Sequence, residues 1–292
     1  PPAIMSVYLG DQLEKLFMDI KEGNLTITED GGDMDLGLSQ ILNFKRDPGD
    51  RNRTSPFAFT GNRFEFRAVG SGQSVSGPLV VMNTMLADSL EWIAGKLDAE
   101  LATGSDQATA VISVLRDLIT EHGNAVFGGD GYSTDWHTAA VDEHGLKNIP
   151  TTADALPALR EKSVKELFAS TGVLSPVELE SRFEVYSEQY ILAIELEANL
   201  VVEMAKSSIY PTAISYLSEL AAANVSMAEM SIELDSSTAK TVASEANAMM
   251  AAVAKLSAAL EQHDFESTEE HMQFLANDVR SLMDEVRQHA DA

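Results

Sequence analysis

The sequence of 292 residues contains no cysteine. Disulfide scaffolds, cysteine-ligated zinc sites and thiol catalysis are therefore excluded, because each needs a thiol or a thiolate. Basic side chains are also scarce, since 20 lysine and arginine residues stand against 46 aspartate and glutamate residues, giving a formal net charge of −26. Phosphate backbones and anionic membrane surfaces attract basic proteins, so we expect neither nucleic acid nor a membrane as a partner.

Long hydrophobic runs are missing as well. Charged residues interrupt every helix-like stretch before it could span a bilayer, and the sequence does not open with the pattern of a secretory signal. Hydrophobic residues nevertheless make up 45% of the chain, which is typical of a folded protein. We therefore expect a globular, cytoplasmic protein. Because the chain starts at Pro1 without a methionine, we expect it to be a fragment or a processed form.

One segment of this acidic chain has an excess of basic residues. Residues 45–67 hold six basic and three acidic side chains. One interpretation is a network of salt bridges with neighbouring acidic helices. The other is an anion site, because guanidinium groups make bidentate contacts with carboxylate and phosphate oxygens.

Within this window, residues 63–67 alternate aromatic and charged side chains. In a strand, Phe64 and Phe66 would point to one side, and Arg63, Glu65 and Arg67 to the other. The two cations would lower the pKa of the carboxylate between them, so that it stays ionised and could bind a hard metal ion. The alternative is a solvent-exposed strand whose charges only pair with each other.

The rest of the sequence predicts few strands and many helices. Residues 3–9 indicate a buried strand, and residues 11–22 a short amphipathic helix that ends at Gly23. Further segments of helical period are residues 79–101, 108–122, 155–169, a long stretch from 176, and residues 227–262 and 267–290. Ser175 and Glu178 have the spacing of a capping box.

The last two segments each carry one apolar stripe that neither can bury alone, so we expect them to dock as an antiparallel hairpin. The predicted fold class is therefore α+β. It has a small antiparallel sheet in its N-terminal part and a mostly helical region that ends in a long helical hairpin.

Three histidines in the middle of the chain, His122, His137 and His144, lie near Asp130 and Asp142 in the sequence. A metal site is one interpretation. Because no spacing among them is that of a ligand motif, we favour surface histidines.

Two motifs in the basic window resemble the type III glutamine synthetases. They are Asn52-Arg53-Thr54 and Arg63-Phe64-Glu65-Phe66-Arg67, within residues 50–71. The resemblance continues through residues 77–84, 127–132, 151–157 and 177–182, and so covers most of the chain.

The resemblance implies two parts, residues 1–225 as the C-terminal portion of the catalytic domain and residues 226–292 as the helical hairpin of the type III C-terminal region. The family's N-terminal β-grasp domain and most of its metal-binding glutamates have no counterpart here. We therefore expect a fragment truncated at both ends and inactive alone.

The resemblance also implies roles for single residues. Arg53 would contact the transferred phosphoryl group, and Glu65 would be a ligand of an Mg²⁺ or Mn²⁺ ion near the nucleotide phosphates. Arg63 would face ATP, and Arg67 would face glutamate or its phosphorylated form. The chain departs from the wider family in lacking a second arginine after Thr54 and a lysine at Thr60, so other phosphate contacts would come from elsewhere, such as Arg46 or Arg51.

The implied activity is that of a glutamate–ammonia ligase, in which ATP phosphorylates glutamate and ammonia then attacks the acyl phosphate. The implied assembly is a homo-oligomer, a dodecamer of two hexameric rings. The alternative function is a non-catalytic helical scaffold or oligomerisation module, whose long helices would themselves be the functional part.

Overall fold

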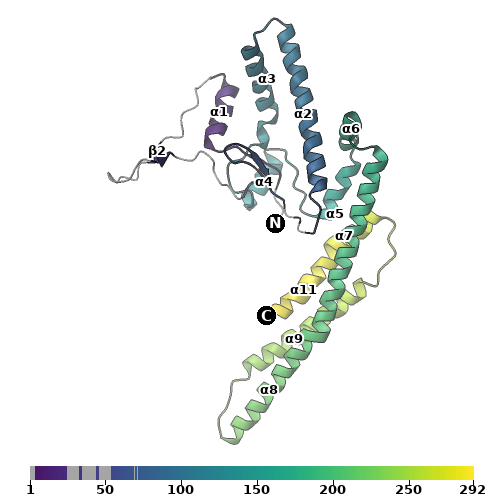
Figure 1. The fold of residues 1–292 in the computed structure, drawn as a ribbon. Helices are drawn as coiled ribbons and strands as arrows, with labels where there is room; N and C mark the ends of the chain where they lie inside the picture. The colour runs from purple at the N-terminus through teal and green to yellow at the C-terminus, as the bar shows by residue number, and fades with distance from the viewer. Residues whose placement is uncertain (1–3, 25–32, 35–43, 46–53, 69, 71) are drawn as a thin grey trace. The chain divides into compact units, whose positions relative to one another are not determined.

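The computed structural model describes residues 4–24, 33–34, 44–45, 54–68, 70 and 72–292 (Figure 1). The chain forms two compact units. The first consists of Pro1–Pro150 and Glu166–Leu174, and the second of Thr151–Lys165 and Ser175–Ala292. The structure is 72% helical with a small sheet near the N-terminus, which confirms the predicted α+β class.

A three-stranded sheet forms the β part of the first unit. It has the order β1 (Val7–Tyr8), β4 (Phe57–Phe59) and β5 (Phe64–Phe66). The predicted antiparallel pairing holds for β4 and β5, while β1 adds to β4 in parallel. Val126 bridges to Val7 on the other side of β1.

A second, two-stranded antiparallel sheet pairs β2 (Asp33–Met34) with β3 (Phe44–Lys45).

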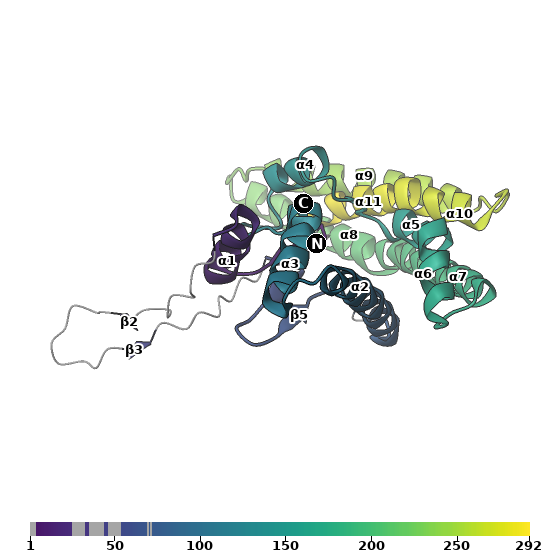
Figure 2. The same ribbon diagram turned by 90° about the horizontal axis from the view of Figure 1, so that it is seen from above.

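The helices of the first unit are α1 (Asp11–Glu22), α2 (Ser76–Ala102), α3 (Gln107–His122), the short 3₁₀ helix η1 (Gly123–Ala125) and α4 (Thr134–Asp142), seen from above in Figure 2. As predicted, α1 ends at Gly23, which has a φ of 83° and donates its N–H to the carbonyls of Asp19 and Ile20. Only a residue that accepts a positive φ closes a helix in this way, so the glycine determines where α1 ends.

The regular elements described in the second unit are all helices. Its elements are α5 (Thr152–Ala155), η2 (Leu156–Arg160), α7 (Pro176–Met204), η3 (Ala205–Ile209), α8 (Tyr210–Glu229), α9 (Ser237–Ala259), α10 (Thr268–Phe274), η4 (Leu275–Val279) and α11 (Arg280–Asp291). Helix α6 (Lys162–Thr171) runs across the sequence boundary between the two units.

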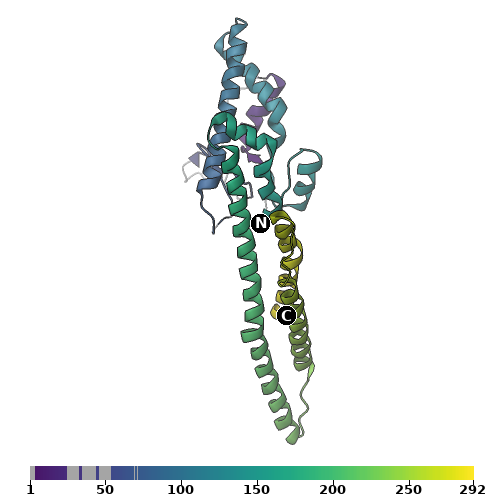
Figure 3. The same ribbon diagram turned by 90° about the vertical axis from the view of Figure 1, so that its right-hand side faces the viewer.

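Helices α7 and α8 join into one long rod through the π-helical segment η3 (Figure 3). The predicted capping box is present at the start of α7, where Ser175 and Glu178 bond to each other's backbone N–H. Pro211 lies in the first turn of α8. Because proline has no N–H to donate to the preceding turn, a local change of helical pitch there is physically expected.

The C-terminal helices form the predicted docked hairpin. Met249, Val253 and Leu256 of α9 are buried in one core with Leu275, Val279 and Val286 of the α10–η4–α11 helix, and Ala198 and Ala205 of the rod belong to the same core. The predicted start at residue 227 is wrong, because α8 continues to Glu229 and α9 begins only at Ser237. Ser231, with a φ of 60°, lies in the turn between them.

Within the described part of the chain, no helix is long and apolar enough to cross a membrane.

A charged face on strand β5 as the candidate functional site

The site lies on a tight β-hairpin. Strands β4 and β5 meet at Gly61, whose φ is 94°, and the N–H of Thr60 donates to the carbonyl of Arg63 over 2.8 Å. Short hairpin turns favour positive φ values, because these match the twist of the strands. The glycine thus lets the chain reverse and sets the register in which Glu65 lies opposite Ala58.

Strand β5 brings three of the predicted site residues together. The Nη2 of Arg63 lies 2.8 Å from Glu65 Oε1, and the Nη2 of Arg67 lies 3.2 Å from Glu65 Oε2. Each oxygen of the carboxylate therefore accepts from a different guanidinium group. Hydrogen bonds from Arg63 first, and then from Arg67, hold the pKa of Glu65 below its usual range, as the sequence predicts.

The three side chains differ in their exposure to solvent. Arg63 is 70% exposed, while Arg67 and Glu65 are 29% and 34% exposed. A guanidinium group keeps donors beyond those used for one carboxylate, and each carboxylate oxygen has a second lone pair. The face can therefore receive an anion at Arg63, whose side chain is mostly exposed, and a hard cation at Glu65. The charges also pair with one another along the strand, which is the alternative that the sequence left open.

The opposite face of the hairpin is aromatic. Phe57 and Phe64 stack with ring centroids 5.1 Å apart and an interplanar angle of 11°. The hairpin register pairs Phe57 with Phe66 and Phe59 with Phe64, which places the rings on one side, as predicted. Phe64 and Phe66 are 46% and 38% exposed in this chain, so this side is only partly covered.

Arg53, predicted to contact the phosphoryl group, lies outside the described residues, as do Arg46 and Arg51. Its neighbour Thr54 is described, and the Thr54 hydroxyl donates to the carbonyl of Gly129 over 3.3 Å. This contact links the segment before β4 to the glycine-rich loop of residues 127–132. The glycine-rich loop is visible in the sequence, but its contact with Thr54 joins residues 75 positions apart and has no local signal.

Two of the histidines near this loop lie within hydrogen-bonding distance of backbone carbonyl oxygens. His137 Nε2 lies 3.3 Å from the carbonyl oxygen of Gly131, and His144 Nδ1 lies 2.7 Å from that of Asn124. Among the residues that the structure describes, no group of three histidine, aspartate or glutamate side chains could hold a metal ion.

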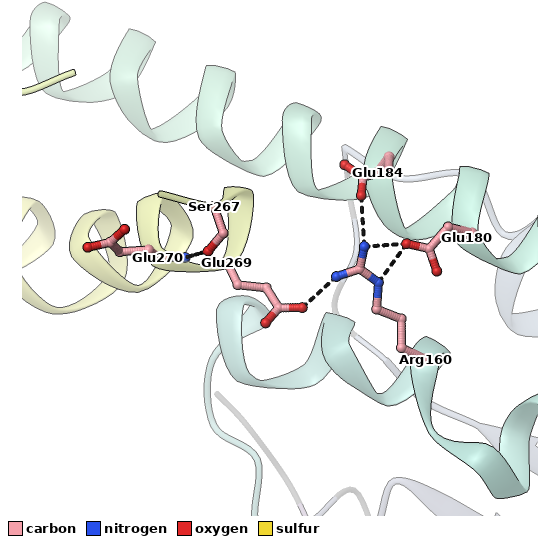
Figure 4. Close-up of polar contacts among 6 residues, drawn as sticks. All are labelled: Arg160, Glu180, Glu184, Ser267, Glu269 and Glu270. Carbon is pink, nitrogen blue, oxygen red and sulfur yellow. Dashed lines mark hydrogen bonds and ion pairs between the residues drawn. The ribbon is translucent and has the colours of Figure 1, made fainter. Parts of the chain in front are cut away.

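A second cluster of charges surrounds Arg160 in the second unit (Figure 4). Its guanidinium group donates to Glu180 and Glu184 of α7 and, over 2.7 Å, to Glu269 of α10. The guanidinium carbon also lies 3.7 Å from the centroid of the Phe183 ring. Because one cation joins two helices far apart in the sequence, we interpret this cluster as a structural link.

Comparison with known proteins adds to this geometry. Residues 110–228 match the family model described as the glutamine synthetase C-terminal domain. The chain is 37% identical over 300 residues to the type-3 glutamine synthetase of Dictyostelium discoideum, an alignment that covers the whole chain and 40% of that protein. It is 33% identical to a glutamine synthetase of Bacteroides fragilis and 30% identical to one of Butyrivibrio fibrisolvens, each over 75% of the chain.

The helix-rich α+β fold, the Arg-x-Glu-x-Arg strand and these sequence matches together indicate one class of protein. The chain is similar to the glutamine synthetases and, along its whole length, to a type-3 member of that family. It spans 40% of the length of the Dictyostelium relative and 30% and 31% of the two bacterial ones.

Proposed function

We propose that the chain is part of an ATP-dependent glutamate–ammonia ligase that makes glutamine through γ-glutamyl phosphate. The observation that carries the proposal is the charged face of β5, in a chain similar along its whole length to a type-3 glutamine synthetase. Phosphoryl transfer depends mainly on positioning and on neutralising charge, so arginines next to an ionised carboxylate are suitable groups for it.

Within this proposal each residue has one task. Arg63, the most exposed of the three, donates hydrogen bonds to the nucleotide phosphates. Arg67, held in place by Glu65, orients the glutamate carboxylate or its phosphorylated form. Arg53 stabilises charge on the transferred phosphoryl group.

Glu65 fits a hard divalent cation, because its carboxylate is ionised and partly exposed. When bound, Mg²⁺ or Mn²⁺ would neutralise phosphate charge. The chain's own contribution is to hold Glu65 in its charged form.

The test compares the 292-residue chain with the full-length gene product. The full-length protein is expected to form glutamine from glutamate and ammonia with one ATP consumed per glutamine, and the isolated chain is expected to form none. Absence of ATP-dependent glutamine formation by the full-length protein would overturn the proposal. Glutamine formation by the isolated chain would show that its own residues complete the site.

We also propose that the protein assembles with copies of itself. Leu192, Leu196 and Leu200 of α7 are 65%, 70% and 50% exposed and follow one another at intervals of four residues. Residues four apart lie on the same side of a helix, so these side chains form an apolar strip on the rod. An exposed apolar strip of this kind favours burial against another surface.

A further inference from the structure

The three-stranded sheet places side chains of β1, β4 and β5 in rows that cross it. Tyr8 pairs with Ala58, and Ala58 pairs with Glu65, so these three residues form one row. Residues paired in this way point to the same face of a sheet, with neighbouring Cβ atoms roughly 5 Å apart. Ala58 therefore lies between Tyr8 on one side and Glu65 on the other, on the face that carries the charges.

The space around Ala58 is closed. Ala58 is 0% exposed and Tyr8 is 2% exposed, whereas the Glu65 side chain is 34% exposed. The Tyr8 ring also lies near Gly10, since a Cβ placed on Gly10 would be 3.8 Å from Tyr8 Cε1 and 3.8 Å from the hydroxyl oxygen. A larger side chain at position 58 would meet packed groups on the Tyr8 side, so it would displace the more exposed Glu65 side chain instead.

The backbone of the hairpin is held on both sides of the pair formed by Ala58 and Glu65. The N–H of Thr60 donates to the carbonyl of Arg63 over 2.8 Å, and the N–H of Arg67 donates to the carbonyl of Pro56 over 2.8 Å. A shift of the register by one residue would turn every side chain of β5 to the opposite face. The strain of a larger residue at position 58 is therefore taken up by side chains and not by the register.

A displacement of the Glu65 carboxylate affects both arginines. Its Oε1 lies 2.8 Å from the Nη2 of Arg63, and its Oε2 lies 3.2 Å from the Nη2 of Arg67. A movement of about 1 Å away from either guanidinium group exceeds the usual hydrogen-bond range. The carboxylate therefore keeps both bonds only while its side chain has room beside Ala58.

We propose that Ala58 is a positioning residue for the charged face of β5. Its methyl group leaves the Glu65 side chain the room in which the carboxylate bonds to Arg63 and Arg67 at the same time. This inference rests on the proposed function, since the tasks of the two arginines belong to that reaction. Ala58 itself touches no reacting atom, because it is fully enclosed.

The first test measures glutamine synthesis by the full-length gene product with Ala58→Val. Valine is favoured in strands, so the substitution adds volume without opposing the strand conformation. We expect kcat/KM for glutamate to fall about 10²-fold, the effect of displacing a catalytic group by about 1 Å, and the KM for glutamate to rise at least about fivefold as Arg67 moves. Loss of folded enzyme alone would lower kcat and leave this KM unchanged. A KM for glutamate within about twofold of the wild-type value would overturn the proposal.

The second test does not depend on activity. Differential scanning calorimetry measures the Tm of the full-length protein with Ala58→Val, alone and together with Glu65→Ala. Ala58→Val alone is expected to lower the Tm by about 2–6 °C, because an overpacked side chain destabilises the fold. With Glu65→Ala the shift should be less than about half as large, because the side chain beside position 58 is then only a methyl group. Equal shifts in both backgrounds would refute the positioning role.

Ala140→Val in α4 is the matched control, because Ala140 is also 0% exposed but belongs to the core around Ile4 and Trp136. It is expected to lower the Tm equally in both backgrounds and to leave the KM for glutamate unchanged. A rise in this KM as large as that of Ala58→Val would also overturn the proposal. The two tests separate the two proposals, since a wild-type protein that makes no glutamine, with a Tm shift that still depends on Glu65, would refute the proposed function but not the placement of Glu65 by Ala58.

Discussion

Glu65 keeps its negative charge because two guanidinium groups surround it, and that charge can be tested at the scale of one residue. We expect Glu65→Ala in the full-length gene product to lower glutamine synthesis by at least about 10²-fold, since a carboxylate that binds a metal ion or orients arginines is lost. Assembly should remain intact, because Glu65 is partly exposed and contributes no core volume. Glutamine formation as a function of metal concentration, together with the mass in solution, measures both effects.

Glu121→Ala is the matched control for this substitution, since the Glu121 side chain is 65% exposed and lies at the end of α3. It should leave turnover unchanged. Near-normal turnover and metal dependence in Glu65→Ala would show that the metal assignment is wrong.

His271 predicts a pH dependence of stability. Its ring stacks on Phe265 with centroids 4.2 Å apart, and its Nε2 lies 3.3 Å from Glu195 Oε1. Burial lowers the pKa of His271 below 6.5 and nearby His263 lowers it further, while Glu195 acts in the opposite direction. The pKa of His271 is therefore lower in the folded protein than in the unfolded protein. Above its unfolded-state pKa, His271 makes its full contribution to stability. This contribution is lost as the pH falls through the folded-state pKa of His271.

Urea unfolding between pH 5 and pH 7.5 measures this effect. We expect the loss of unfolding free energy on acidification to be smaller for His271→Gln than for the wild type, because glutamine stays neutral over this range. His122→Gln is the control, since the His122 side chain is 60% exposed. An identical loss in wild type and His271→Gln would mean that other groups cause the acid sensitivity.

At the scale of elements, Arg160 links α7 to α10 through three glutamates. We expect Arg160→Met to lower the unfolding free energy of the second unit by about 1–2 kcal/mol, because three neighbouring carboxylates lose their common cation. The estimate stays small because the Arg160 side chain is 33% exposed and solvent screens its charge. Urea unfolding monitored by circular dichroism measures the change.

Arg287→Met provides the comparison for Arg160, since Arg287 pairs with Asp291 at an exposed i,i+4 position. It should cost less than about 0.5 kcal/mol. Equal costs for the two substitutions would show that the link through Arg160 adds nothing to an ordinary surface pair.

At the scale of the whole molecule, the apolar strip on α7 predicts self-assembly. We expect Leu192→Glu with Leu196→Glu to reduce the mass of the full-length gene product in solution, because two like charges would be buried at each contact. The melting temperature should change little, since both side chains are exposed within the chain. Light scattering after size-exclusion chromatography measures the mass.

Deleting the C-terminal hairpin would be a poorer test of assembly. The hairpin shares one core with Ala198 and Ala205 of the rod, so its removal would expose that core. Lys206→Glu, also on the rod but in the π-helical segment, is the control for added negative charge. An unchanged mass for the double leucine variant would exclude the α7 strip as the assembly surface.

Local features of this protein could be predicted from the sequence alone. Gly23 ends α1, the Ser175 capping box starts α7, and Glu65 lies between two arginines on one side of β5. Each depends on residues no more than four positions apart, whose relative placement follows from the geometry of a helix or a strand. The division of the chain at residue 225 and the roles of Arg53, Arg63, Glu65 and Arg67 remain predictions.

Other features were decided only by the tertiary structure. The helical periodicity of the alanine-rich segment predicted a helix from residue 227, but α9 starts at Ser237. Periodicity does not show where one helix ends and the chain turns back into the next. Three contacts join residues far apart in the chain. They are the parallel pairing of β1 with β4, the link from Arg160 to Glu269 and the hydrogen bond from Thr54 to Gly129. The sequence by itself determined most of the helical segments, the capping box that starts α7 and which charges share the strand. Packing decided which distant segments meet, because such contacts depend on how the whole chain buries its apolar surface and not on the pattern of any one segment.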